Sequence, residues 1–297
     1  MDNQLASNTT TRVIAQDFDY SAPASLAEAL SIRNEYGEDV RPLAGGTDLL
    51  IELKADLREE GHLMSLDGVD ELNHITDADD DLVIGATVTF DQLIESPLVN
   101  DWFPSLSEAA SDAGGVQVEK MGTVGGNLCN ASPAASSAPP LLNLDARVTL
   151  QSEDGERTVP LDEFFTGPKQ TLLESDELLT EVRVPKTRFD GWAHEEVKRV
   201  TEDLAKAIVS VVVQRDGDVI TDCRIGLGCV APVPMRASNA EAVLNGETFS
   251  DDVLARAGAT AREEISPISD SRSTSEYRRL ITETKIEDLL TEAWDRA

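Results

Sequence analysis

Two segments with paired glycines are the parts of this sequence best suited to hold a ligand. The first glycine segment runs from Ala44 to Leu50 and reads AGGTDLL. Its paired glycines let the backbone turn sharply and lie close to a bound group. A helix expected to begin near Thr47 or Asp48 would add unpaired N–H groups and the positive end of a helix dipole, which together suit a pyrophosphate. A plain strand-to-helix turn fits the same pattern, because the segment has neither the Walker nor the Rossmann spacing.

The second glycine segment runs from Gly122 to Pro133 and reads GTVGGNLCNASP. It places another glycine pair among threonine, asparagine and serine side chains, and it leads into a run of small residues, AASSAPP. Small residues and hydrogen-bonding side chains around bare backbone are typical of a ligand wall, although a loop packed between domains has the same composition. Two such segments predict one ligand held between them.

Lys198-Arg199 is a basic pair in an acidic chain, and we expect it in the strand EEVKRV. It could contact the phosphates of a ligand or pair with Glu195 or Glu196. The residues alone favour the ion pair.

Near the C-terminus, Tyr277, Leu280 and Ile281 have helical spacing, which predicts core packing with the neighbouring arginines on the surface or paired with an acidic neighbour. No catalytic triad and no metal site are expected, because the three histidines form no cluster: His62, His74 and His194. No iron–sulfur cluster of this chain's own is expected either. Its three cysteines lack C-x-x-C spacing and are expected to be small buried residues: Cys129, Cys223 and Cys229.

The pattern of strands and helices expected around these residues predicts an α+β protein. Residues 12–66 have a βαβ-like pattern with a capped helix at SLAEALSIRNEYG. Residues 67–187 mix strands with helices: we expect a strand at LVIGATVTF, a helix at DQLIESPLV and a hairpin at RVTLQSEDGERTVPL. Together they form an expected domain, 12–187. Residues 193–297 change to strands followed by helices, which predicts a separate α+β domain with a three-stranded antiparallel sheet. Ser238 and Glu241 predict a capping box at the start of its first helix.

The charge of the chain excludes some partners. Of its 297 residues, 56 are acidic and 25 are basic, a formal net charge of −31. Such a surface repels nucleic acid and anionic membranes. It favours a solvated surface adapted to high salt, with an acidic docking face as the alternative. No run approaches the roughly 20 apolar residues of a membrane span, and the N-terminus has no signal-peptide pattern, so we expect a cytoplasmic protein.

Four segments resemble a known family when they are taken together. AGGTDLLIELK, GTVGGNLCNASPAASSAPPLLNLDARV, EVKRV and SPISDSRSTSEYRRLI stand in the order found in flavin subunits of molybdenum hydroxylases. That group includes the medium subunits of carbon monoxide dehydrogenases and the FAD subunits of xanthine dehydrogenases. The resemblance covers about residues 12–290, and the TVGGN segment with its NASPAA continuation is its most specific part.

This resemblance implies an FAD-binding domain of the PCMH (vanillyl-alcohol oxidase-like) type in two subdomains, divided near residue 66, and a C-terminal domain of the CO dehydrogenase flavoprotein type. The residues that it implies at the FAD pyrophosphate are Pro42, Leu43, Ala44, Gly45, Gly46, Thr47, Asp48 and Leu49. The second wall would comprise Thr123, Gly125, Gly126 and Asn127. Lys198 would approach the flavin from the C-terminal domain, and Leu179 or Thr180 would flank its ring. Many relatives carry an aspartate at the position of Ser136, so this serine is an FAD residue with one contact weakened.

The resemblance also implies partners. Substrate would be oxidised on a molybdopterin-binding large subunit, and electrons would pass through a [2Fe–2S] small subunit to FAD here and then to NAD or another acceptor. Two alternatives remain open at this point. One is a stand-alone flavin reductase of the UDP-N-acetylenolpyruvoylglucosamine reductase type, and the other is a scaffold subunit that has lost its flavin.

Overall fold

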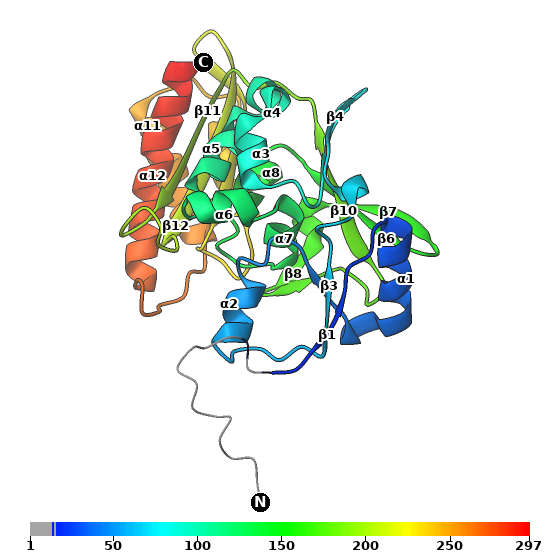
Figure 1. The fold of residues 1–297 in the computed structure, drawn as a ribbon. Coiled ribbons are helices and arrows are strands. Elements are labelled where there is room, and N and C mark those ends of the chain that lie inside the picture. Colours follow the sequence, from blue (N-terminus) through cyan, green and yellow to red (C-terminus); the bar gives the residue numbers. More distant parts are fainter. Residues whose placement is uncertain (1–13, 15) are drawn as a thin grey trace, which may run out of the picture.

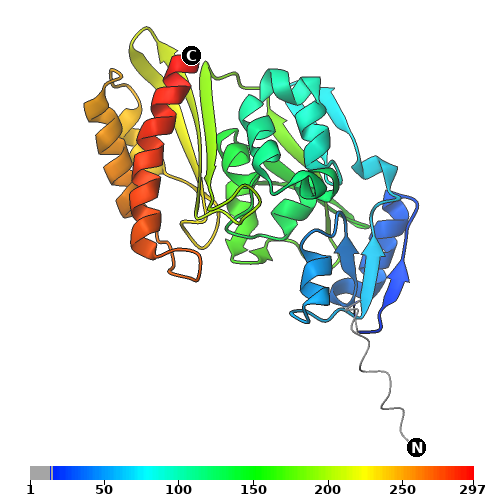
Figure 2. The same cartoon turned by 60° about the vertical axis from the view of Figure 1, so that its left-hand side comes forward.

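The computed structural model describes residue 14 and residues 16–297 (Figure 1). The expected domain start at residue 12 and most of the segment examined for a signal peptide lie outside the described residues. Figure 2 shows the described chain as three parts in a row, from the N-terminal part through the middle part to the C-terminal part. No helix among the described residues is long and apolar enough to cross a membrane.

The N-terminal part is the expected βαβ-like unit. Its three-stranded sheet has the order β1-β3-β2, and both neighbouring pairs are parallel. The strands are β1 (Asp19–Ser21), β2 (Arg41–Leu43) and β3 (His62–Ser65). The connecting helices are α1 (Leu26–Tyr36), the 3-10 helix η1 (Gly37–Asp39) and α2 (Leu49–Lys54). The Ser25 side chain caps α1 by accepting from the Glu28 N–H, as the sequence predicts.

The middle part is built on a five-stranded antiparallel sheet of order β4-β5-β10-β6-β7. Its strands are β4 (Ile75–Ala78), β5 (Asp81–Gly85), β6 (Arg147–Ser152), β7 (Gly155–Pro160) and β10 (Leu178–Pro185). The expected β6–β7 hairpin is present. The strand expected over residues 82–90 ends early, at Gly85. The cause is local: Thr89 and Gln92 form a capping box that starts the next helix.

Short helices cover this sheet and carry the second glycine segment. They are η2 (Asp70–Leu72), α3 (Phe90–Glu95), α4 (Pro97–Trp102), α5 (Pro104–Asp112), α6 (Val116–Met121), α7 (Val124–Cys129), α8 (Ala138–Asn143) and α9 (Leu161–Phe164), followed by β8 (Phe165–Gly167) and β9 (Gln170–Thr171). The single helix expected at DQLIESPLV is divided at Ser96, because Pro97 disfavours helical geometry in the residue before it.

The C-terminal part contains the three expected antiparallel strands and a fourth of two residues. The order is β11-β12-β13-β14, with β11 (Gly191–Val197), β12 (Ala207–Asp216), β13 (Val219–Gly228) and β14 (Met235–Arg236). One face packs on α10 (Ser238–Leu244), α11 (Asp251–Glu264) and α12 (Ser275–Arg296). The other face meets α5 and α8 of the middle part, as Figures 1 and 2 both show.

Two predictions about these helices are wrong. Ser238 does not cap α10, because the Glu241 carboxylate, its expected capping-box partner, instead accepts from the Ile225 N–H and the Arg236 guanidinium. On α12, only Ile281 of the three apolar residues expected in the core packs there; Tyr277 and Leu280 are exposed, whereas Arg278 is buried.

The burial of Arg278 follows from its contacts. Its guanidinium donates to the backbone carbonyls of Lys206 and Cys229 and pairs with Asp270. These contacts satisfy a charge that would be too costly to bury unpaired, and they confirm the alternative that an arginine ties this helix to an acidic neighbour.

Candidate functional site

The first glycine segment leaves β2 and enters α2 through a turn that only glycine accommodates well. Gly46 has φ +68°, in the left-handed region. A Cβ on Gly45 would lie 1.6 Å from the Met121 carbonyl oxygen, so no side chain fits at this position. The helix α2 begins at Leu49, one or two residues after the expected start, with Asp48 as N-cap but without a side-chain capping bond.

The backbone N–H groups of this turn have no partner within the protein. Among the described residues, none accepts a hydrogen bond from the N–H groups of residues 44–49. Pro42 and Leu43 are the last residues of β2 before the turn, and Thr47 within the turn is half-buried. A run of unpaired donors at the start of a helix, with no side chain in front of the glycines, can bind an anion such as a pyrophosphate.

The second glycine segment differs from the first because its own fold uses most of its donors. The Thr123 side chain caps α7 by accepting from the Gly126 N–H, at 3.1 Å. The N–H groups of Val124 and Gly125 donate to the carbonyls of Val88 and Ala86, at 2.9 Å each. The glycine at 125 is required because a Cβ there would lie 2.6 Å from the Ala86 backbone oxygen. The second segment therefore lets a ligand approach its backbone closely and contact its side chains. The unpaired N–H groups that could bind a ligand come from the first segment.

The two glycine segments lie side by side although about 80 residues separate them in the chain. Gly45 approaches Met121 and Gly122, and a Cβ on Gly126 would lie 3.9 Å from the Ala44 Cβ. Leu179 and Thr180, the residues implied at the ring, are buried in β10, where the Thr180 carbonyl accepts from the Ala86 N–H. The convergence that a single ligand requires is present.

The small-residue run after α7 connects the second glycine segment to the C-terminal part. The Asn127 side-chain amide oxygen accepts from the Ser137 hydroxyl at 2.7 Å and from the Ser137 N–H at 3.2 Å. The Pro133 carbonyl accepts from the Cys229 N–H at 2.7 Å. Ser136 is buried between these two anchors.

Lys198 lies just beyond β11, which ends at Val197, and not within a strand. Its ammonium pairs with the Glu196 carboxylate at 2.9 Å and also donates to the Asp112 carbonyl at the end of α5. The expected ion pair is thus present, with Glu196 as the partner of Lys198, and it brings Lys198 to the wall that holds Ser136. The Ser136 side chain lies beside the Glu196 carboxylate. The wall at Ser136 therefore has a carboxylate next to it, although Ser136 is not itself an acidic residue.

Lys169 is a charged residue at these segments that the sequence did not single out. Its ammonium donates to the Asn130 amide oxygen at 2.6 Å and pairs with Glu52 of α2 at 3.3 Å. It therefore joins α2 to the end of α7. Its positive φ of 60°, unusual for a lysine, is the one local sign of a constrained position, and a sequence does not display φ.

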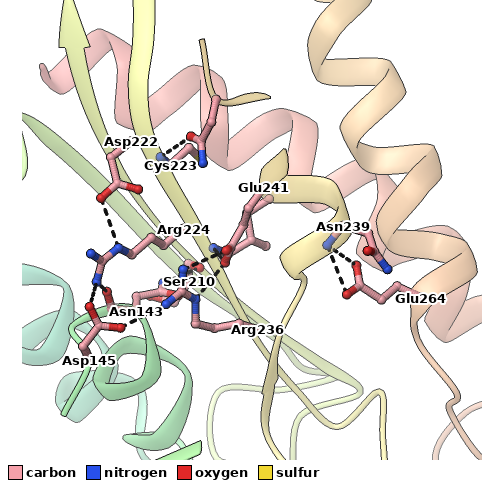
Figure 3. A network of polar contacts seen from close by, with 12 residues as sticks. Asn143, Asp145, Ser210, Asp222, Cys223, Arg224, Arg236, Asn239, Glu241 and Glu264 are labelled. Atoms are coloured by element: carbon pink, nitrogen blue, oxygen red, sulfur yellow. Dashed lines mark hydrogen bonds and ion pairs between the residues drawn. The ribbon is translucent and has the colours of Figure 1, made fainter. Parts of the chain in front are cut away.

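A polar network holds the C-terminal sheet against α8 (Figure 3). Asp145 accepts from Arg224 of β13 at 2.5 Å and from Arg236 of β14 at 3.0 Å. The Glu241 carboxylate holds Arg236 with two bonds, of 2.9 and 2.7 Å. The Asn143 amide donates to the Ser210 carbonyl at 2.8 Å. These contacts fix the sheet, whose strand β11 leads directly to Lys198, relative to the glycine segments.

The three cysteines are free thiols. Cys223 and Cys229 are buried and Cys129 is half-buried, and burial raises the pKa of Cys129 and of Cys229 to about 12. The described residues contain no group of three or more His, Cys, Asp or Glu side chains that could hold a metal ion.

Comparison with known proteins decides the family. The family described as "FAD binding domain in molybdopterin dehydrogenase" matches residues 16–187, and "CO dehydrogenase flavoprotein C-terminal domain" matches residues 192–293. The chain is a member of the FAD-binding medium subunits of molybdenum hydroxylases. It is thus a subunit of an oxidoreductase, and its cofactor is FAD.

Relatives of this family with different named substrates are about equally similar to the chain. The carbon monoxide dehydrogenase medium chain of Hydrogenophaga pseudoflava is 34% identical, over 96% of this chain and 99% of the relative. The caffeine dehydrogenase subunit beta of a Pseudomonas species is 33% identical, over 94% and 95%. The putative xanthine dehydrogenase FAD-binding subunit of Escherichia coli K12 is 32% identical, over 92% and 95%.

Solved structures of the family agree with the fold along almost the whole chain. Carbon monoxide dehydrogenase from Hydrogenophaga pseudoflava superposes with a TM-score of 0.93 at 35% identity, covering 96% of this chain and all of the other. Quinoline 2-oxidoreductase from Pseudomonas putida 86 gives a TM-score of 0.90 at 28% identity, covering 95% and 98%.

Proposed function

We propose that this medium subunit binds FAD between its two glycine segments and relays electrons within a three-subunit molybdenum hydroxylase. The observation that carries the proposal is the turn at residues 44–49, whose N–H groups have no partner among the described residues and which lies against the second glycine segment. The residues present fit the cofactor: a pyrophosphate needs several donors and no intruding side chain, and Gly45 and Gly46 meet both needs.

Each predicted site residue has a role in this proposal. Backbone N–H groups between Ala44 and Leu49 would hold the pyrophosphate, with Pro42 and Leu43 fixing the turn beneath. Thr123, Gly125, Gly126 and Asn127 would form the facing wall, where Asn127 also holds the loop that carries Ser136. Lys198 would present a positive charge from the C-terminal part. FAD, when bound, supplies the capacity to take up and release electrons, and the chain supplies position and electrostatics.

The relatives' names, such as medium chain and FAD-binding subunit, support an assembly with other subunits. We propose that a molybdopterin-binding large subunit oxidises the substrate and that a [2Fe–2S] small subunit passes the electrons to this chain, which delivers them to NAD or another acceptor. Relatives named for carbon monoxide, caffeine and xanthine dehydrogenases have 32–34% identity to this chain, so its sequence does not select among these substrates. Substrate selection then belongs to the large subunit.

The test uses the purified full chain and FAD. We expect the chain to take up about one FAD with bound-flavin absorbance, to be reducible by dithionite, and to oxidise none of the candidate substrates until the two partners are added. A chain that stays colourless in excess FAD would support the flavin-free scaffold instead. Turnover of NADPH with the enolpyruvyl sugar nucleotide by the isolated chain would establish the stand-alone reductase.

A further inference from the structure

Two adjacent glutamates of β11 point to opposite faces of the C-terminal sheet. Side chains alternate along a strand, and here Glu195 pairs with Lys285 of α12 at 3.0 Å, on the helical face. Glu196 faces the other way, toward the middle part, where it pairs with Lys198 at 2.9 Å. The two residues are therefore a natural pair for comparison, because they have the same charge and are neighbours in the chain but have different surroundings.

The Glu196–Lys198 pair is almost completely shielded from water. The side chains of Glu196 and Lys198 are 4% and 8% exposed. The Lys198 ammonium has a second acceptor in the Asp112 carbonyl. By contrast, the Oε1 atom of Glu196 is buried without a partner of good hydrogen-bond geometry among the described residues. A buried carboxylate oxygen left in this way is costly unless it serves an adjacent charge or ligand.

Among the groups around this pair, Lys198 is the main electrostatic partner of Glu196. Burial raises the pKa of Glu196, Lys198 and the Ser136 side chain oppose that rise, and Asp112 adds to it. Cys229 also lies within reach of the Glu196 charge, but burial raises its own pKa to about 12, so it stays a neutral thiol. His194, on the same face, has its pKa lowered to about 3 by burial and by Lys198, so it is neutral as well. One buried carboxylate thus offsets one buried ammonium.

We propose that Glu196 is a positioning residue that holds the Lys198 ammonium at the wall of the flavin site and partly cancels its charge, thereby lowering the midpoint potential of bound FAD. The contacts connect the pair to that wall: Ser136 lies beside Glu196, and its neighbour Ser137 is bonded to Asn127 of the second glycine segment. Reduction adds negative charge to a flavin, which a nearby ammonium favours and a nearby carboxylate opposes. The low-dielectric surroundings make both effects larger than they would be in water.

This inference rests on the proposed function, and the experiment separates the two. The full chain is reconstituted with FAD as wild type, Glu196→Gln and the matched control Glu195→Gln, and midpoint potentials are measured by spectroelectrochemical titration. Glu196→Gln leaves the Lys198 charge uncancelled, so we expect the reduced-to-oxidised ratio at a fixed potential to rise at least tenfold. That change corresponds to about 30 mV for a two-electron couple. Glu195→Gln changes the net charge equally and should leave the potential where it is.

Glu196→Asp keeps the charge and should keep the potential near that of the wild type. If Glu196→Gln does not take up FAD, Glu196→Met, which is neutral and of similar length, is measured in its place. A wild-type chain that binds no FAD refutes the proposed function. FAD-loaded variants in which the neutral substitution at 196 leaves the potential unchanged, or shifts it no more than Glu195→Gln does, refute the role of Glu196 alone.

Discussion

At the residue scale, Gly45 gives the sharpest test of the first glycine segment. A Cβ there would meet the Met121 backbone oxygen at 1.6 Å, so Gly45→Ala must push the two segments apart. Forcing one methyl group into a packed contact costs about 1–3 kcal/mol. We expect a loss of that size in the free energy of unfolding, measured by urea titration, together with weaker FAD uptake measured by flavin absorbance.

Gly61→Ala is the matched control for that substitution, because a Cβ at Gly61 meets no atom within 4 Å. It should leave both stability and FAD uptake close to wild type. Equal FAD affinity in the Gly45→Ala and wild-type proteins would remove the first glycine segment from the cofactor site.

His194 predicts a specific dependence of stability on pH. Burial, aided by Lys198, lowers its pKa to about 3, and neither ring nitrogen has a hydrogen-bond partner among the described residues. The unfolded chain, with a histidine pKa of about 6.5, takes up the proton more readily, so stability falls as the pH drops below about 6.5. Between pH 7 and pH 5 this one group should remove about 2 kcal/mol.

The check on that prediction is His194→Leu, which removes the titrating group and fills the same buried space with an apolar side chain. Urea titrations at pH 7 and pH 5 should show the stability of the variant falling less than that of the wild type, by about the amount assigned to His194. An identical pH dependence in the two proteins would mean that His194 reaches water or a partner in solution.

Residues whose role is local could be predicted from the sequence, whereas those defined by distant contacts could not. The glycine pair at Gly45–Gly46 was recognisable because a sharp turn before a helix leaves a local pattern of residue types. Glu196 appeared only as one of two candidate partners for Lys198, because nothing in EEVKRV says which glutamate faces inward. Lys169 was missed entirely, since its contacts are with Glu52 and Asn130, far away in the chain.

At the element scale, sequence patterns predicted the presence of most strands and helices better than their ends or exposed faces. The capping residue Ser25 sets the start of α1 through a bond within one turn, which a sequence displays. The face of α12 was predicted wrongly because apolar spacing at Tyr277 and Leu280 competed with the bonds of Arg278 to two distant carbonyls. A helical period alone does not show which face a neighbouring element will cover.

Glu241 of α10 helps to hold the C-terminal sheet in place through its contacts with β13 and β14. Its carboxylate is 7% exposed at the side chain, binds Arg236 twice and accepts from the Ile225 N–H. Glu241→Gln loses the charge and leaves Arg236 short of an acceptor, which should lower the free energy of unfolding by about 2–3 kcal/mol. Urea titration measures the change.

Glu264→Gln is the comparison for that element, and both glutamates are visible in Figure 3. Among the described residues, Glu264 accepts a hydrogen bond from the exposed Asn239 N–H alone. Its substitution should change stability by less than about 0.5 kcal/mol, as is usual for surface positions. Comparable losses in the two variants would mean that the network does not anchor the sheet.

At the scale of the whole molecule, the uncompensated negative charge should dominate the response to salt. The chain has 56 acidic and 25 basic residues, and its net charge of −31 makes the folded state repel itself. Many of its ion pairs are open to water, such as Arg188 with Asp101, whose side chains are 56% and 64% exposed. Screening weakens these pairs too, but an exposed pair contributes only about 0–1 kcal/mol, so relief of the repulsion wins.

We therefore expect the melting temperature, followed by circular dichroism, to rise with KCl. Most of the rise should occur below about 1 M, because the screening length has already fallen from about 10 Å at 0.1 M to about 3 Å at 1 M. Sucrose at matched osmolality strengthens burial without screening charge, so its effect can be subtracted. A melting temperature that stays flat in KCl up to 1 M, or that rises no more than in sucrose, would mean that the acidic residues are already neutralised in the fold, and the acidic docking face would then be the better account of this composition.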